Sequence, residues 1–111
     1  MNAQTDRKPS PAALEPRRLS SAVTGQTGVI VGVFADPSFN VGGVDCAELE
    51  RRLLEAGFVE GARVTLLHEG PLGGDPIAVR VAHTTVALRR REAMSILVRG
   101  LVRGLVTAVA P

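Results

Sequence analysis

Glycine and proline recur between short apolar runs along this chain, and that alternation limits what the chain can fold into. The 12 glycines and 7 prolines among 111 residues leave room for only short regular elements. Several short strands joined by tight turns within about 80 residues are typical of a small β-barrel. β-Branched or alternating runs predict five strands, at Gly28–Phe34, Arg63–His68, Ile77–Val81, Thr84–Leu88 and Ile96–Val98.

One helix interrupts this series of strands. Asp45 can cap its N-terminus, because a carboxylate accepts hydrogen bonds from free backbone amides, and Glu48 stands three positions later as in a capping box. Apolar residues follow at helical spacing on one face. Gly57 can end the helix in the left-handed conformation that a Cβ would oppose. The pattern predicts a helix over Asp45–Ala56, inserted after the first strand.

The folded part is expected to span residues 19–99. Residues 1–18 are polar and interrupted by prolines, which predicts a disordered leader. Residues 100–111 contain a second copy of Arg-Gly-Leu-Val and are expected to form a mobile or loosely docked tail. Inside the folded part, glycine and proline predict a loop over Gly70–Pro76, and Arg90–Met94 is expected to form one helical turn.

Composition restricts the compartment and the class of partner. Cys46 is the only cysteine, so no intramolecular disulfide can form. No signal peptide is recognisable at the N-terminus, and no apolar run approaches the length of about 20 residues that a membrane span needs, so a cytoplasmic protein is expected. The formal net charge is +2, and the chain contains no Tyr or Trp. Without stacking aromatics or a broad basic face, nucleic-acid binding is not expected.

Catalytic and metal-binding motifs are weak or missing in the sequence. There is no phosphate-binding glycine loop and no serine nucleophile motif, so no enzyme is expected. His68 and His83 could converge with Cys46 or acidic residues, but no pair has the local spacing of metal ligands. Cys46 is better explained as a small buried hydrophobe. We therefore predict no cofactor and no tight metal site, with any binding of Fe²⁺ or another transition metal being weak.

Ordered blocks occur at Arg51–Phe58, Gly61–Val64, Pro71–Ile77 and Ala87–Arg90 with Glu92–Ala93, after an upstream set of Leu19, Val23, Gly25 and Ile30. In this order they resemble the FeoA family over about 80 of the 111 residues. The last block contains the Ala-Leu-Arg run that resembles the family's A-L-R-x-x-E-A pattern, and the third resembles its P-L-G-D-P-I loop. The loop over residues 36–43 is longer than the minimal family pattern, and its role is open.

The resemblance implies an all-β fold with short helices, namely a small SH3-like β-barrel with one helix after the first strand. It also implies a non-enzymatic cytosolic accessory of bacterial ferrous iron uptake. Such a protein would bind FeoB, the membrane ferrous iron transporter with a GTPase domain, and would meet the membrane only through that partner. The alternative is a metal-responsive regulatory or metallochaperone module, because similar domains occur in iron-dependent repressors. Oligomeric state is left open, a homo-oligomer included.

A partner surface is predicted around the Pro71–Pro76 loop. Leu72 would act as an apolar anchor between two prolines that restrict the loop. In the alternative interpretation, Leu72 packs into the core and the loop only joins two strands. The residues predicted to contact the partner are Leu72, Pro71, Asp75, Arg51, Arg52 and Leu54.

Overall fold

The computed structural model describes residues 15–103, and all five predicted strands and the predicted helix are present in it. The two short strands β3 and β4 form a separate hairpin; β3 lies inside the long loop over residues 36–43, and β4 directly follows that loop. In chain order the elements are β1 (Arg17–Arg18), η2 (Leu19–Ser21), β2 (Gln26–Val33), β3 (Asn40–Val41), β4 (Val44–Asp45), α2 (Cys46–Glu55), β5 (Arg63–Gly70), β6 (Gly74–Val81), β7 (Thr84–Leu88), α3 (Arg90–Ala93) and β8 (Ile96–Arg103).

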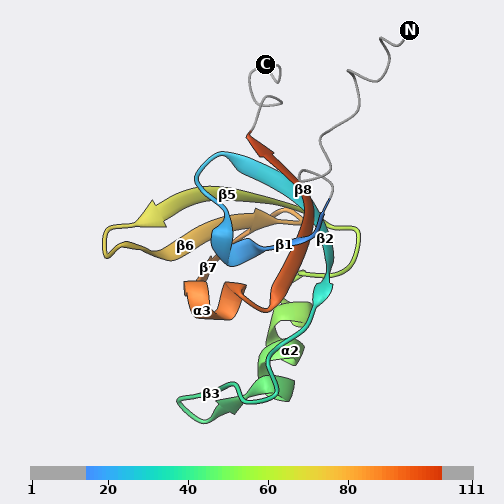
Figure 1. The fold of residues 1–111 in the computed structure, drawn as a ribbon, viewed down its shortest axis with the longest axis vertical. Helices are drawn as coiled ribbons and strands as arrows, with labels where there is room; N and C mark the ends of the chain where they lie inside the picture. Colours follow the sequence, from blue (N-terminus) through green and yellow to red (C-terminus); the bar gives the residue numbers. More distant parts are fainter. Residues whose placement is uncertain (1–14, 104–111) are drawn as a thin grey trace, which may run out of the picture.

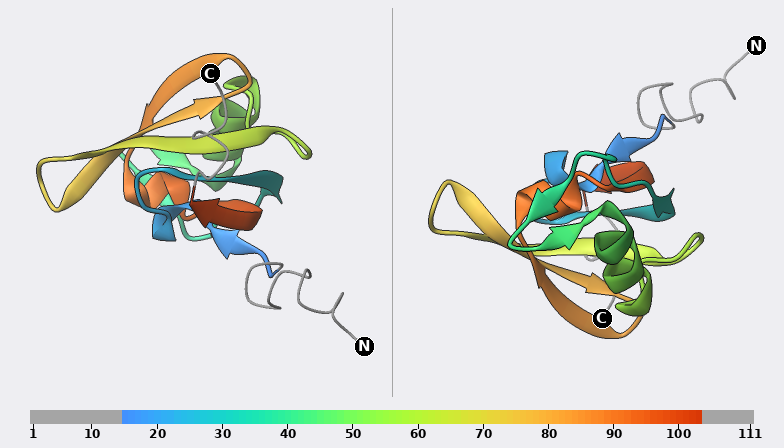
Figure 2. Two further views of the ribbon diagram at one scale, coloured as in Figure 1. Left: turned by 90° about the horizontal axis from the view of Figure 1, so that it is seen from above. Right: turned by 90° about the horizontal axis from the view of Figure 1, so that it is seen from below.

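The main sheet is antiparallel, with strand order β1-β8-β2-β5-β6-β7 (Figure 1). It is strongly curled, so β6 and β7 lie on one side of the molecule and β8 and β1 on the other (Figure 2). Alternate side chains of each strand point into the space between them. The buried apolar residues are aliphatic apart from one phenylalanine, and the largest fully buried side chains are Phe58, Leu19, Ile30, Leu66, Ile77 and Ile96.

Helix α2 begins and ends as the sequence predicts. The Asp45 carboxylate accepts a hydrogen bond from the backbone N–H of Glu48 at 2.9 Å. At the other end Gly57 has a φ of 111°. The amides of Gly57 and Phe58 donate to the carbonyls of Leu54 and Leu53, at 3.0 and 3.1 Å. This pair of bonds is a Schellman motif, and it turns Phe58 back into the core.

The prediction that all of Gly70–Pro76 forms a loop is wrong. Gly70 and Gly74 pair across a tight β5–β6 hairpin, and only residues 71–73 form its turn. Gly73 and Gly74 have φ values of 69° and 82°, a conformation that glycine adopts without strain. Pro76 lies at an irregular step in the β5–β6 pairing, where a proline does not remove a regular ladder hydrogen bond.

Strand pairing also reaches beyond the predicted limits of the folded part. The last strand was expected to end at Val98, but β8 continues to Arg103, and the Leu101 side chain is only 6% exposed. Arg17 and Arg18 of the expected leader pair with β8. The rest of the predicted leader and tail, residues 1–14 and 104–111, lies outside the described residues.

Candidate functional site

The β5–β6 hairpin projects from the sheet and carries Leu72 at its tip (Figures 1 and 2). The Leu72 side chain is 80% exposed, the most exposed of the large apolar residues described. The alternative in which Leu72 packs into the core is therefore wrong. Pro71 beside it is also exposed. The hairpin presents an aliphatic side chain to solvent at the end of a short turn in which Gly73 and Gly74 have positive φ values.

The base of this hairpin is too tight for a side chain at Gly70. A Cβ built on Gly70 would lie 2.5 Å from the carbonyl oxygen of Asp75 and 2.6 Å from that of Pro76. Both oxygens belong to the backbone, so they cannot move aside cheaply. Gly70 thus lets the two strands approach each other where the turn begins.

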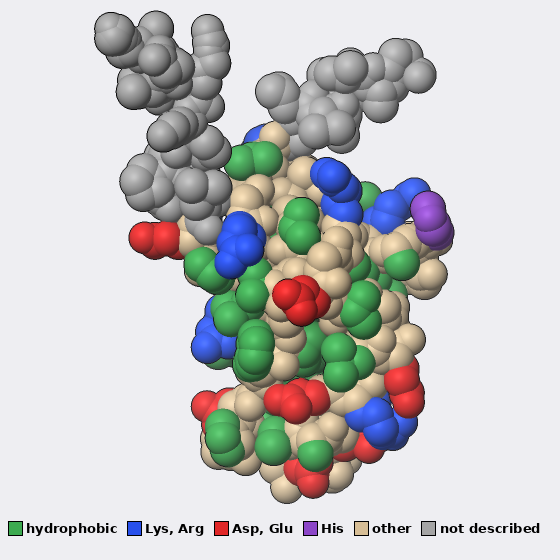
Figure 3. Space-filling view, turned by 90° about the vertical axis from the view of Figure 1, so that its right-hand side faces the viewer, with side chains coloured by type: hydrophobic (Ala, Val, Ile, Leu, Met, Phe, Trp, Pro, Cys, Tyr) green, Lys and Arg blue, Asp and Glu red, His purple; other side chains and the backbone are tan. Residues whose placement is uncertain are grey.

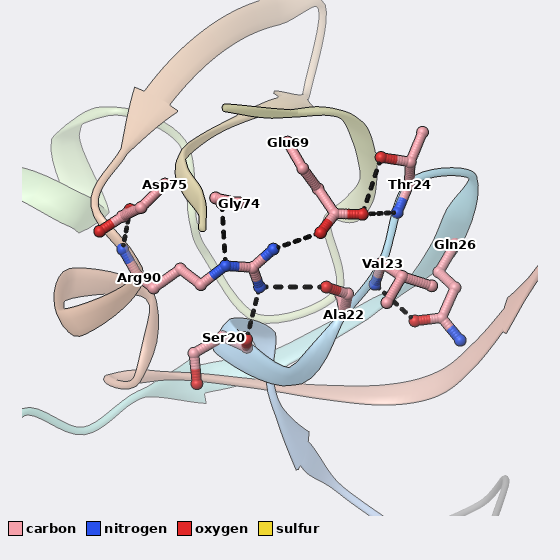
Figure 4. A network of polar contacts seen from close by, with 9 residues as sticks. All are labelled: Ser20, Ala22, Val23, Thr24, Gln26, Glu69, Gly74, Asp75 and Arg90. Carbon is pink, nitrogen blue, oxygen red and sulfur yellow. Dashed lines mark hydrogen bonds and ion pairs between the residues drawn. The ribbon is translucent and has the colours of Figure 1, made fainter. Parts of the chain in front are cut away.

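Arg90 of α3 holds the hairpin base to the N-terminal segment of the domain (Figure 4). Its Nε donates to the carbonyl of Gly74 at 3.0 Å, and its Nη1 donates to the carbonyl of Ser20 at 2.7 Å. Its Nη2 lies 2.8 Å from Oε1 of Glu69. The side chain is only 24% exposed, so one guanidinium joins β5, β6 and η2 in a partly desolvated place.

Glu69 extends this network to the segment before β2. Its Oε2 accepts hydrogen bonds from the backbone N–H and the hydroxyl of Thr24, at 2.9 and 3.0 Å. These two bonds, with smaller contributions from the charges of Arg90 and Arg103, hold the pKa of Glu69 below its ordinary value. The ionised carboxylate is therefore the form that the folded hairpin base favours.

Asp75 also has a structural partner. Its Oδ1 accepts a hydrogen bond of 2.9 Å from the backbone N–H of Arg90, at the first residue of α3. That amide has no partner inside the helix, so the carboxylate satisfies a group that would otherwise be free. Asp75 is half-buried at the hairpin base, away from the tip where Leu72 stands.

The other predicted contact residues lie on α2, away from the hairpin tip (Figures 1 and 2). Arg51 bridges Glu48 and Glu55, and Arg52 also pairs with Glu48. The Arg52 and Arg51 hydrogen bonds lower the pKa of Glu48. The sequence predicted Arg51 and Arg52 near Leu72, and this is wrong, because both arginines lie on α2 and Leu72 lies at the tip of the β5–β6 hairpin. Leu54 is 47% exposed on the same helix and defines a second apolar position.

The side chains considered as metal ligands stay apart. His68 lies on β5 opposite Ala78, His83 lies in the β6–β7 turn, and Cys46 is half-buried at the start of α2 rather than fully buried. Between residues 15 and 103, no three or more His, Cys, Asp or Glu side chains come together in a way that could hold a metal ion. The described residues therefore offer no preformed chelating site.

Residues 17–100 match the model of the FeoA domain family. This chain belongs to the FeoA family. Among solved structures, FeoA of Stenotrophomonas maltophilia in complex with zinc is 33% identical, with a TM-score of 0.60 over 77% of this chain and 94% of that one. FeoA of Chlorobium tepidum is 32% identical, with a TM-score of 0.61 over 78% of this chain and 71% of that one. No curated protein sequence matches the chain.

The predicted SH3-like fold is confirmed by these FeoA structures. The Stenotrophomonas protein is described as a prokaryotic SH3-domain protein and a proposed activating factor of ferrous iron transport. Part of a manganese-dependent transcriptional repressor has the same fold at 23% identity, with a TM-score of 0.60 over 79% of this chain and 43% of that one. Within the described part of this FeoA chain, no helix has the length and apolarity to cross a membrane.

Sequence reasoning did not find the anchor of the FeoA hairpin. The sequence places Arg90 in the middle of a run of three arginines and at the start of a predicted helical turn, and it does not predict Glu69 or Thr24 beside it. The position of that run in the A-L-R-x-x-E-A block was the only available signal. It does not reveal which arginine turns inward, because that depends on how α3 sits against the β5–β6 hairpin.

The Glu69 contacts predict how acid affects this hairpin. Because the folded-state pKa of Glu69 is lowered from 4.5, its contribution to stability is complete above that value and is lost as the pH falls through the folded-state pKa. Glu69→Gln should therefore make the free energy of unfolding less dependent on pH below about 4.5. Denaturant titrations at a series of acidic pH values measure this. Glu55→Gln, at an exposed position of α2, serves as the control. Identical pH profiles of unfolding for Glu69→Gln and wild type would contradict a role of the Glu69 carboxylate in acid stability.

Proposed function

We propose that this FeoA-family chain is a non-enzymatic cytosolic accessory of ferrous iron uptake that binds a FeoB-type membrane transporter. Support comes from the family itself, whose solved members include proteins described as iron transport proteins. The observation that carries the site is Leu72, 80% exposed at the tip of a hairpin whose base is firmly bonded. Iron itself would be the cargo of the transporter.

The hairpin has the physical properties of a binding element. Anchoring by Arg90 at its base and restriction of φ at Pro71 lower the conformational entropy that would be lost when a partner holds the tip. An exposed aliphatic side chain on a rigid support can enter an apolar pocket and lose its water there, and a few fully desolvated residues at the centre of an interface carry most of its binding energy. We infer that Leu72 is the central contact and that Pro71 lies at its edge.

The second candidate function is a metal-responsive regulatory module. It rests on the fold shared with the manganese-dependent repressor, and at 23% identity that likeness concerns the fold alone. The FeoA family match covers residues 17–100 and favours the transport accessory.

Leu72→Asp should separate binding from folding. The variant should keep the thermal midpoint of the wild type, because Leu72 buries little surface in the domain. It should weaken association with the purified cytosolic domain of FeoB by about 30-fold, the size expected for a central apolar contact. Calorimetry or surface plasmon resonance, with and without guanine nucleotide, measures the affinity.

Two further variants sharpen this test. Val59→Asp places the same charge on another exposed aliphatic residue, in the α2–β5 connection, and should leave the affinity unchanged. Leu54→Asp tests the apolar position on α2. A normal affinity for Leu72→Asp together with a weakened one for Leu54→Asp would move the interface to α2. Absence of wild-type binding would refute the proposed partner.

A further inference from the structure

The outward face of the sheet brings together arginines that are far apart in the sequence. Arg63 of β5 pairs with Val29 of β2, and Val29 pairs with Arg99 of β8. Two residues after Arg63 on the same strand, Thr65 pairs with Arg80 of β6. Each of these arginines is exposed and alternates with buried strand neighbours, so all three side chains are on the outer surface of the curled sheet. We call Arg63, Arg80 and Arg99 the sheet arginines.

Two shallow hollows join the sheet arginines into one surface. A hollow of about 420 Å³ is lined by Arg63 and Arg99 together with Val29 and Val102. A neighbouring hollow of about 350 Å³ is lined by Arg63 and Arg80 together with His83. Arg63 belongs to both. Val29 and Val102 are 40% and 46% exposed, so aliphatic surface lies between the positive charges.

No acidic residue neutralises this surface within residues 15–103. None of the sheet arginines takes part in the ion pairs of the described residues, all of which involve Arg51, Arg52 or Arg90. Acidic side chains are most frequent at the opposite end, around α2 and the β3–β4 hairpin, in the lower part of Figure 3. The described part of the molecule therefore has a basic side and an acidic end, although its overall charge is close to balanced.

We propose that the sheet arginines form a docking face for an anionic phospholipid bilayer. Guanidinium groups bind phosphate oxygens well, and basic residues near a negatively charged membrane are each attracted to it. The charges extend over four adjacent strands instead of converging on one closed pocket, which suits a surface of many headgroups. Val29 and Val102 lie between the sheet arginines and can contact the apolar edge of the headgroup layer. The acidic end would be repelled, so the molecule would bind in one orientation.

This contact goes beyond the proposed function and does not require the hairpin tip. A nucleic acid also offers phosphates, but neither hollow is lined by Phe, Tyr or Trp, and the one ring on which a base could stack is the His83 imidazole. If the chain also works beside a membrane transporter, lipid contact would raise its concentration at the surface where the transporter is embedded.

Vesicle sedimentation with the full chain tests the proposal. Wild type should bind vesicles of phosphatidylcholine containing about 30% phosphatidylglycerol, and should not bind pure phosphatidylcholine. Binding should largely disappear between about 50 mM and 500 mM salt, because screening weakens it. The triple variant R63Q/R80Q/R99Q should lose about 100-fold in affinity, or about fivefold for each single change.

A matched variant controls for net charge. R52Q/R89Q/R91Q removes the same number of exposed positive charges elsewhere and should retain most of the affinity. Thermal midpoints show whether each variant is folded. If the triple variant R63Q/R80Q/R99Q does not fold, the affinities of the three single variants test the proposal in its place.

Equal losses of affinity in the two triple variants, or no wild-type binding to anionic vesicles at low salt, would overturn the proposal. Equally tight binding to a short DNA duplex, lost in the same variants, would show general polyanion binding and would also overturn it. Leu72→Asp should bind vesicles normally, so failure here is distinguishable from failure of the transporter partner.

Discussion

Phe58→Ala is expected to lower the free energy of unfolding by about 3–5 kcal/mol. Phe58 is 0% exposed and is the largest fully buried side chain of the described residues. Its removal would leave a cavity between α2 and the sheet, because the Schellman motif holds the backbone at this position in place. Urea denaturation followed by circular dichroism measures the change.

Phe34→Ala is the natural control for this prediction. Phe34 is also a phenylalanine, but its side chain is more than half exposed, so the change should stay within about 0.5 kcal/mol. A loss below about 1 kcal/mol for Phe58→Ala would show that the core can collapse around the missing ring.

Arg90→Ala is expected to lower the free energy of unfolding by about 2–4 kcal/mol. The substitution removes bonds to the carbonyls of Ser20, Ala22 and Gly74 and leaves the Glu69 carboxylate without its cation. Amide hydrogen exchange should also become faster at Gly70 and at residues 72–74, because the hairpin base loses its attachment. Denaturant unfolding and nuclear magnetic resonance measure the two effects.

Arg90→Lys should recover little of this loss. A lysine ammonium cannot reproduce the planar fork that reaches Gly74, Ser20 and Glu69 at once. Arg91→Ala, at the exposed neighbouring position, should change stability by less than about 0.5 kcal/mol. Full stability of Arg90→Lys would mean that charge alone, without the geometry, holds the hairpin.

These expected effects bear on the proposed interface. If Arg90 keeps the hairpin rigid, Arg90→Ala should weaken FeoB binding less than Leu72→Asp does, because it alters the support and leaves the anchor side chain. The comparison separates the contribution of the contact from the contribution of preorganisation.

Elements whose causes are local could be predicted from the amino-acid sequence. Asp45, Glu48 and Gly57 lie within a few residues of the helix ends that they define, so α2 was predicted to within one residue at each end. β7 was predicted with its observed bounds, Thr84–Leu88, because three of its five residues are β-branched and favour a strand. The five-strand pattern and the family resemblance together predicted the barrel, which the FeoA structures confirm.

Features that depend on partners far away in the sequence could not be predicted in this way. Gly70 and Gly100–Arg103 became strand because β6 and β2 pair with them, an interaction that local propensity cannot register. The exposure of Leu72, the inward turn of Arg90 and the separation of Arg51 from the hairpin tip follow from how the elements pack. The sheet arginines meet because three strand pairings place them in register. Along the sequence these arginines are far apart and acidic residues lie between them, so a count of charges does not reveal the cluster. The pairing register that brings them together exists only in the assembled sheet.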